Sequence, residues 1–117
     1  MGVTIYHNPR CSKSRQTLQL LRDRGIEPRI VEYLKEPPAE EQLDAILELL
    51  GLEPRQLLRT GESAYLEAGL DDANLSREQI IRLMVKNPIV IERPIVVVDG
   101  KAAVGRPPEN VLSILPR

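Results

Sequence analysis

The chain has 117 residues, a formal net charge of -1, 42% hydrophobic residues, one Cys, and neither Phe nor Trp. This length and composition are typical of one globular domain whose core is built from Leu, Ile and Val. The near-zero charge and the lack of large rings argue against nucleic-acid binding, and no apolar run approaches the roughly 18 residues that a membrane span requires. We therefore expect a cytoplasmic monomer without a nucleic-acid or membrane partner.

The N-terminal part of the chain predicts a strand, a helix and a second strand. Residues 3–6 are a β-branched and aromatic run that stops at His7-Asn8-Pro9. From 14 to 24 Leu recurs at helical spacing, and Gly25 follows as a stop signal. A second strand is expected at 29–34. Together these elements form a βαβ unit, in which the two strands are parallel and the crossover is right-handed.

The middle of the chain is predicted to be entirely helical. Apolar spacing and the Pro and Gly signals place helical segments at about 39–50, 54–59, 62–68 and 76–87. Ser76 and Gln79 fit a capping box at the start of the last segment, and Pro88 must end it. These segments form a predicted helical insert over about 39–87.

The C-terminal part predicts two strands and a helix. Residues 95–98 are four β-branched residues in a row, the pattern of a strand covered on both faces. Asp99-Gly100 suits a two-residue hairpin turn into a strand at 101–104, and a last helix begins near Pro108. The order βαβ, helical insert and ββα matches the thioredoxin-like plan, an α/β fold with a mixed four-stranded sheet. We expect one such domain over residues 1–117.

Cys11 lies between the first strand and the first helix, at the expected helix N-terminus. Free backbone N–H groups and the helix dipole favour an anion there, and Arg10, Lys13 and Arg15 add positive charge. A lone Cys is usually an inert buried residue, but these surroundings favour a reactive thiolate. One Cys also excludes an intramolecular disulfide and a zinc site with several Cys ligands, and no metal is expected.

The sequence Cys-Ser-Lys-Ser-Arg contains the parts of an oxyanion-binding loop. It offers a sulfur nucleophile, a run of N–H groups, the hydroxyls of Ser12 and Ser14, and the planar fork of Arg15. His7 precedes Cys11 by four residues, where it would either raise the local potential when protonated or hold the loop by a hydrogen bond.

Three arginines outside this loop are less informative by themselves. Arg93 and Arg106 each precede a Pro, which favours an extended backbone, and both flank the second pair of strands. Arg59 carries no signal from composition or periodicity. Spacing alone does not bring any of the three to Cys11, and each fits a solvated surface charge.

Six motifs follow one another along the chain. They are Thr4 to Arg15, Tyr33-Leu34 before Pro37-Pro38, Leu57-Leu58-Arg59, Asn87-Pro88-Ile89, Glu92 to Val97, and Gly105 to Glu109. Together they resemble the glutaredoxin-coupled arsenate reductase family over nearly the whole chain. The best-known members have Gly-Thr after the nucleophilic Cys, so Ser12-Lys13 resembles a shorter branch with the sequence Cys-Ser-Lys-Ser-Arg.

The resemblance implies a thioredoxin-like fold and an oxidoreductase that reduces arsenate to arsenite in arsenic detoxification. It implies no bound cofactor, with glutathione and glutaredoxin as reductants and partners. Cys11 corresponds to the nucleophile that forms a covalent arsenate adduct, and His7 to the residue that helps keep it a thiolate. The family arginines that bind the oxyanion correspond to Arg59, Arg93 and Arg106. Pro94 corresponds to a cis-proline beside the active Cys.

The single Cys agrees with the reductants that the resemblance implies. An enzyme with one Cys must release its adduct to an external thiol, and glutathione followed by glutaredoxin supplies one. Two alternatives use the same fold. A general glutathione-dependent thiol oxidoreductase needs Cys11 without the arginines. A thiol-stress regulator that binds RNA polymerase typically switches through Cys-x-x-Cys, whose second position is Ser14 here.

Overall fold

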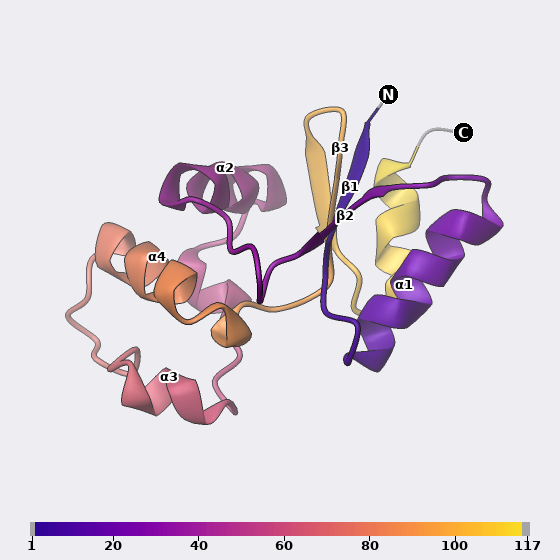
Figure 1. Cartoon of the computed structure of the whole chain (residues 1–117). Helices are drawn as coiled ribbons and strands as arrows, with labels where there is room; N and C mark the ends of the chain where they lie inside the picture. Colours follow the sequence, from indigo (N-terminus) through magenta and orange to yellow (C-terminus); the bar gives the residue numbers. More distant parts are fainter. Residues whose placement is uncertain (1, 116–117) are drawn as a thin grey trace. The chain divides into compact units, whose positions relative to one another are not determined.

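The computed structural model describes residues 2–115, so the ends of the predicted 1–117 domain lie outside the described residues. The chain divides into two compact units. Residues 2–36 and 93–115 form the first, which we call the sheet unit, and Pro37–Glu92 forms the second, the helical unit, within which the predicted insert of 39–87 lies. Figure 1 shows the elements of both.

The sheet unit contains one mixed sheet with the strand order β2-β1-β3-β4. The strands are β1 (Val3–His7), β2 (Arg29–Glu32), β3 (Ile95–Val98) and β4 (Lys101–Val104). β1 pairs parallel with β2 and antiparallel with β3, and β3 pairs antiparallel with β4 (Figure 1). This confirms the predicted α/β class and the four-stranded mixed sheet. The second strand ends two residues earlier than expected, because the chain turns after Glu32.

The hairpin between β3 and β4 forms as its sequence predicts. Asp99 and Gly100 have φ values of 47° and 74°, the left-handed pair that a two-residue type I′ turn requires. β3 is buried along its length except at Val97, which is half-buried, as expected for a run of β-branched residues inside a sheet.

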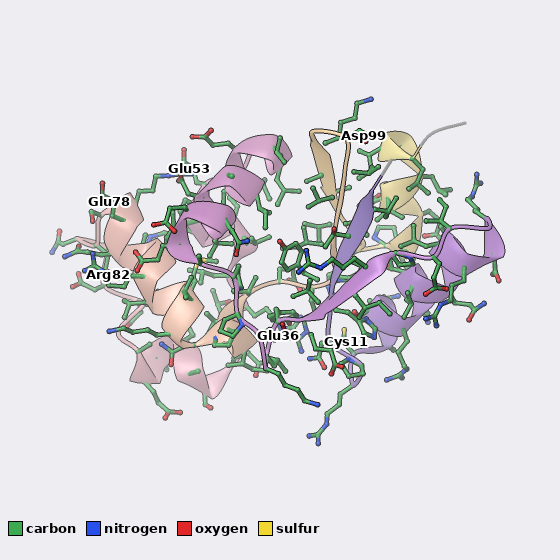
Figure 2. All side chains as sticks on the ribbon, turned by 45° about the horizontal axis from the view of Figure 1, so that its top comes forward. Cys11, Glu36, Glu53, Glu78, Arg82 and Asp99 are labelled. Atoms are coloured by element: carbon green, nitrogen blue, oxygen red, sulfur yellow. The ribbon has the colours of Figure 1, made fainter. Side chains whose placement is uncertain are left out.

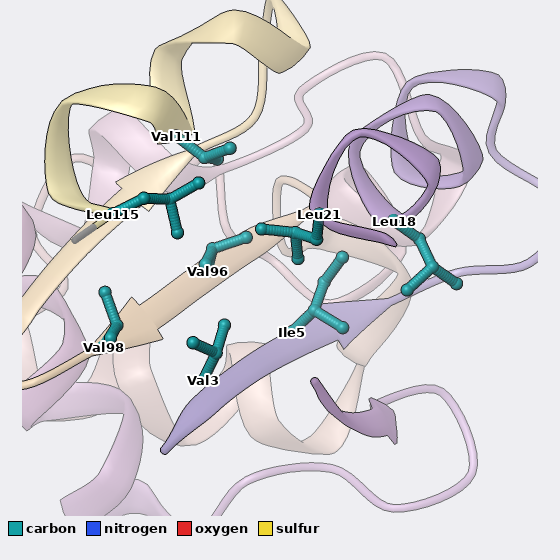
Figure 3. Packing of buried hydrophobic residues seen from close by; sticks show 8 residues of the cluster. All are labelled: Val3, Ile5, Leu18, Leu21, Val96, Val98, Val111 and Leu115. Carbon is teal, nitrogen blue, oxygen red and sulfur yellow. The ribbon is translucent and has the colours of Figure 1, made fainter. Parts of the chain in front are cut away.

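The core of the sheet unit is aliphatic. Helix α1 (Ser12–Asp23) and the 3₁₀ segment η3 (Pro108–Ile114) pack on the sheet around a cluster of eight residues (Figure 3). The cluster consists of Val3, Ile5, Leu18, Leu21, Val96, Val98, Val111 and Leu115. At roughly 25 cal/mol per Å² of buried apolar surface, such side chains provide the main driving force for folding.

The last helix differs from its prediction. It is a 3₁₀ helix, with backbone bonds from Asn110 N–H to Pro107 and from Leu115 N–H to Leu112. The Ser113 hydroxyl donates to the Asn110 carbonyl, and the Asn110 amide donates to the Arg106 carbonyl. Side-chain bonds of this kind compete with the α-helical ladder and favour the tighter turn.

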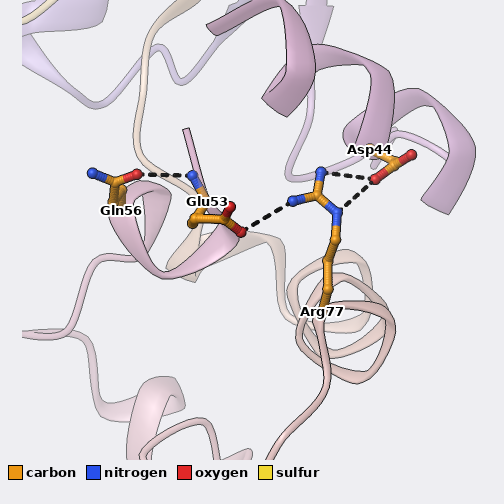
Figure 4. A network of polar contacts seen from close by, with 4 residues as sticks. All are labelled: Asp44, Glu53, Gln56 and Arg77. Atoms are coloured by element: carbon orange, nitrogen blue, oxygen red, sulfur yellow. Dashed lines mark hydrogen bonds and ion pairs between the residues drawn. The ribbon is translucent and has the colours of Figure 1, made fainter. Parts of the chain in front are cut away.

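The helical unit contains α2 (Glu40–Leu50), η1 (Pro54–Leu57), α3 (Ser63–Glu67), α4 (Arg77–Lys86) and η2 (Pro88–Val90). Ser76 Oγ accepts the N–H of Gln79 at 3.1 Å and Gln79 Oε1 accepts the N–H of Ser76 at 2.8 Å, which confirms the capping box. Gly51 ends α2 with a φ of 69°. Arg77 donates to Asp44 and Glu53 and so links α4 to α2 and to the start of η1 (Figure 4).

The helical unit is not wholly helical, which corrects the prediction. Leu58 and Ile91 form an isolated antiparallel bridge. Arg59 N–H donates to Val90 at 2.7 Å and Glu92 N–H donates to Leu57 at 2.8 Å. The backbone is extended here because two 3₁₀ helices end side by side and their next residues satisfy each other's polar groups. Within residues 2–115, no helix is both long enough and apolar enough to cross a membrane.

Candidate active site at Cys11

Cys11 is the N-cap residue of α1, at the end of the loop that follows β1 (Figure 2). Its backbone is extended, its N–H donates to Asn8 O at 3.0 Å, and its carbonyl accepts the N–H of Arg15 at 3.0 Å. The thiol is partly exposed. An N-cap side chain faces the N–H groups of the first helical turn, which have no partner within the helix. The sulfur therefore lies where an anion is stabilised.

The surroundings of the sulfur favour a thiolate. Burial alone raises the pKa of the Cys11 thiol, but the hydrogen bonds that the sulfur receives outweigh burial and hold the pKa below its ordinary value. The donors are the backbone N–H of Ser14, the guanidinium of Arg93 and the backbone N–H of Lys13. The positive charge of Arg93 lowers the pKa further. These contacts make Cys11 a candidate nucleophile at neutral pH.

The Ser14 hydroxyl is buried and bonds to groups of the protein, whereas the sequence predicted that it would bind an oxyanion. Its side chain is 0% exposed, and its Oγ lies 2.6 Å from Nδ1 of His7 and accepts the N–H of Asn8 at 3.0 Å. The reason is helical spacing, because residues 14, 17, 18 and 21 form the buried stripe of α1. Ser14 contributes its backbone N–H to the sulfur and its hydroxyl to the loop.

His7 ends β1 and is buried against Ser14. Burial lowers the pKa of His7, the Glu32 carboxylate raises it, and the charges of Arg22 and Arg15 lower it, with a net effect below the ordinary value of 6.5. A neutral imidazole is favoured at pH 7. Of the two roles expected for His7, the structure favours holding the loop by a hydrogen bond.

Asn8 and Arg15 complete the loop. Asn8 is buried, and its Oδ1 accepts the N–H of Arg10 at 3.0 Å while its carbonyl accepts the N–H of Cys11. Arg15 Nη1 donates to Pro9 O at 2.9 Å, so part of the guanidinium that was predicted to bind an oxyanion supports the loop. Sequence reasoning treated Asn8 only as a turn signal. The Asx turn that an Asn commonly forms could have revealed its role.

Arg93 comes to Cys11 from the segment before β3. Its side chain is only 8% exposed and donates to the sulfur. The Arg93–Pro94 peptide bond is cis, as the family resemblance implied for Pro94. The Arg106–Pro107 bond is also cis, which the sequence did not predict. Arg106 follows β4, is partly exposed, and its carbonyl accepts the Asn110 amide at 2.9 Å.

Arg59 belongs to the helical unit and is bound by carboxylates. Its Nη1 lies 2.7 Å from Glu92 Oε1 and its Nε lies 3.4 Å from Glu62 Oε2. Burial lowers the pKa of Arg59, but Glu92 and Glu62 together raise it above its ordinary value. Neither carboxylate was predicted as part of the site. Glu92 lies in one of the six sequence motifs and Glu62 lies three residues after Arg59. Spacing alone does not show that either carboxylate forms an ion pair with Arg59.

Among residues 2–115, no three His, Cys, Asp or Glu side chains gather in a way that would hold a metal ion. The sequence model of the ArsC family matches residues 6–114, a range that includes every residue of the candidate site. This chain belongs to the ArsC family.

Three proteins illustrate the similarity. An arsenate reductase from Neisseria meningitidis is 46% identical over 114 residues, which cover 97% of each chain. An uncharacterized Escherichia coli protein, YfgD, is 53% identical over 114 residues, which cover 97% of this chain and 96% of that one. The solved structure of an arsenate reductase from Vibrio cholerae is 49% identical, with a TM-score of 0.95 and 98% of each chain covered. The thioredoxin-like fold predicted from the sequence is thereby confirmed for this ArsC family member.

Proposed function

We propose that this ArsC family member is an arsenate reductase, an oxidoreductase that converts arsenate to arsenite with Cys11 as its nucleophile. The observation that carries the proposal is the set of donors on the sulfur, which are two backbone N–H groups and the guanidinium of Arg93. The same donors suit a tetrahedral oxyanion that approaches the thiolate. The similarity to proteins named arsenate reductase over almost their full length supports the choice of substrate.

The proposed reaction begins with attack by the Cys11 thiolate on arsenic. A sulfur–arsenic bond forms, and one arsenate oxygen takes up protons and leaves as water. The glutathione sulfur then bonds to arsenic and displaces a second oxygen as water. The glutaredoxin thiolate attacks that glutathione sulfur, the arsenic–glutathione bond breaks, and its electron pair reduces As(V) to As(III) as the mixed disulfide leaves. Water then adds to As(III) and breaks its bond to the Cys11 sulfur, which leaves as a thiolate. Overall, one arsenate and two thiols give one arsenite, one mixed disulfide and one water.

Arginines balance the charge of the oxyanion in this mechanism. Arg93 lies beside the sulfur. It neutralises the negative charge on the arsenate oxygens as the arsenic goes from four to five ligands in the transition state. Arg15 and the N–H of Ser14 hold arsenate at the start of α1. Arg59 and Arg106 enter the proposal through the family resemblance, as further oxyanion ligands.

External thiols are required because the sequence contains one Cys. With no second thiol in the chain, the oxidised arsenic adduct cannot be resolved internally, and glutathione with glutaredoxin provides the route. We therefore also propose a cytoplasmic location, where glutathione keeps thiols reduced.

The test is a coupled assay that follows NADPH consumption with glutathione reductase, glutathione, glutaredoxin and arsenate. The wild-type chain is expected to show arsenate-dependent turnover that needs glutaredoxin, and Cys11→Ser is expected to show none. Replacing glutaredoxin with thioredoxin is the control for the choice of reductant. Absence of turnover by the wild-type chain, or full turnover by Cys11→Ser, would refute the proposal.

A general glutathione-dependent thiol oxidoreductase is the second candidate, because Arg93 and the helix N–H groups activate Cys11 without any oxyanion. Arg93 cannot separate the two candidates, since its loss also affects the thiolate itself. Arg59→Gln is a better variant, because Arg59 is bound by Glu62 and Glu92 in the helical unit. The arsenate reductase predicts a higher KM for arsenate in this variant and unchanged glutathionylation of Cys11. Glutathionylation of Cys11 without any arsenate-dependent turnover would favour the second candidate.

A further inference from the structure

A buried hydroxyl on α1 has a partner next to the candidate site. Thr17 is 0% exposed, and its Oγ1 donates to the carbonyl of Lys13 at 2.8 Å, with the carbonyl of Gly105 at 3.4 Å. A Thr that bonds back to the carbonyl four residues earlier gives the helix no stability and slightly bends it. An aliphatic residue would fill the same buried position, so the hydroxyl itself calls for an explanation.

The carbonyl of Lys13 and the N–H of Ser14 belong to one peptide group. Cys11 is the N-cap residue of α1, so its sulfur lies beside this N–H, which lowers the pKa of the thiol, while the carbonyl accepts the hydroxyl of Thr17 at 2.8 Å. Because a peptide group is resonance-stabilised, a hydrogen bond to its oxygen makes its N–H a stronger donor. Hydrogen bonds in such a chain strengthen one another by roughly 10–30%. The hydroxyl is thus connected to the sulfur through a single peptide group.

We propose that Thr17 is a positioning residue for the Cys11 thiolate, and that its hydroxyl orients and polarises the peptide group between Lys13 and Ser14. Thr17 acts on the sulfur through this peptide group. The inference rests on the proposed function in that the thiolate is taken as the nucleophile. It assigns a role in the reaction to a residue that the sequence motifs did not single out.

Gly105 keeps the Thr17 hydroxyl in place. A Cβ at Gly105 would lie 2.5 Å from Thr17 Oγ1, 3.1 Å from Thr17 Cγ2 and 2.8 Å from Pro94 Cγ, so the three residues leave no room for a side chain. The N–H of Gly105 also donates to Pro94 O at 2.9 Å. The Thr17 side chain therefore packs directly against the backbone of Gly105, which has no side chain to displace it. The same contact joins α1 to Pro94, which follows the Arg93 that donates to the sulfur.

The test compares the pH dependence of Cys11 alkylation by iodoacetamide in four full-length chains without arsenate: wild type, Thr17→Val, Thr17→Ser and Thr17→Ala. Val keeps the shape of Thr and loses the hydroxyl, whereas Ser keeps the hydroxyl and loses the methyl. Below the titration midpoint, Thr17→Val is expected to react about threefold more slowly than wild type, as the loss of a cooperative hydrogen bond implies. Its midpoint is expected to move to higher pH, while Thr17→Ser keeps the wild-type profile.

Two outcomes would overturn the inference. One is a wild-type profile in Thr17→Val, and the other is an equal displacement in Thr17→Ser and Thr17→Val, which would indicate packing alone. If Thr17→Val fails to fold by circular dichroism, Thr17→Ala against Thr17→Ser makes the same comparison, because both lack the methyl and only Ser has the hydroxyl. Alkylation needs no arsenate, so failure of the arsenate assay in the wild-type chain leaves this test independent.

Discussion

The sheet unit and the helical unit use arginine in different ways. In the sheet unit, Arg93 is almost fully buried and donates to the sulfur of Cys11. In the helical unit, Arg59 is bound by Glu62 and Glu92, and Arg77 is bound by Asp44 and Glu53 in the same manner. A guanidinium that faces a thiol activates it, whereas one that faces two carboxylates is largely neutralised before any anion arrives. The number of basic residues therefore says less about anion binding than the partner of each one.

The largest expected effect is the loss of activity when Arg93 of the sheet unit is replaced. Arg93→Met removes the donor and the charge beside Cys11 while keeping an unbranched apolar stem. By comparison with the loss of one oxyanion donor, kcat/KM for arsenate should fall about 10²- to 10³-fold. Alkylation of Cys11 at pH 7 should also slow, because the thiolate loses its counter-charge. An unchanged alkylation rate would contradict the contrast between the two units.

A pair of glycines tests the packing of the two units. Gly105→Ala in the sheet unit forces a Cβ against Thr17 and Pro94 and should lower the free energy of unfolding by about 1–3 kcal/mol. Gly61→Ala in the helical unit is the matched control, because a Cβ there meets nothing within 4 Å and its φ is not in the left-handed region. It should change stability by less than about 0.5 kcal/mol. Urea unfolding of both variants measures the difference, and equal stabilities would contradict it.

The neutral imidazole of the sheet unit predicts a pH dependence. Because the pKa of His7 is lower in the folded chain than its ordinary value of 6.5, His7 contributes stability that is present above pH 6.5. That contribution is lost as the pH falls through the lower folded pKa. His7→Gln should therefore flatten the fall in the urea midpoint between pH 7 and pH 5. His7 is the only His in the sequence, so a fall of equal size in the variant would assign it to other groups.

The smallest expected effect is a change in the KM for arsenate when one of the two ion pairs of Arg59 is removed. Glu62→Gln removes the longer of the two ion pairs of Arg59 and leaves the 2.7 Å pair with Glu92. If Arg59 binds the oxyanion, releasing part of its charge should lower the KM for arsenate about twofold, in line with the small energy of a partly exposed pair. Steady-state kinetics with Glu53→Gln as the control, which removes a carboxylate from Arg77, measures the change. A raised KM in Glu62→Gln would mean that Glu62 orients Arg59 instead.

Short-range signals predicted much of the fold and the position of Cys11 in it. The Ser76 and Gln79 capping box, the Asp99-Gly100 turn and the position of Cys11 at the start of α1 all depend on residues within a few positions of each other. Two features of the fold that the sequence did not predict depend on contacts between residues. The 3₁₀ form of the last helix and the bridge between Leu58 and Ile91 depend on side-chain and backbone partners that periodicity does not reveal.

For this protein, the sequence alone was enough to place its single Cys at a helix N-terminus, because capping and dipole effects act within one turn. Tertiary structure decided which groups surround the sulfur. It brought Arg93 to Cys11, turned the Ser14 hydroxyl inward to His7, and set Thr17 against Gly105, 88 residues away in sequence. Contacts over such distances follow from how a helix packs on a sheet, and no local preference of the chain specifies them.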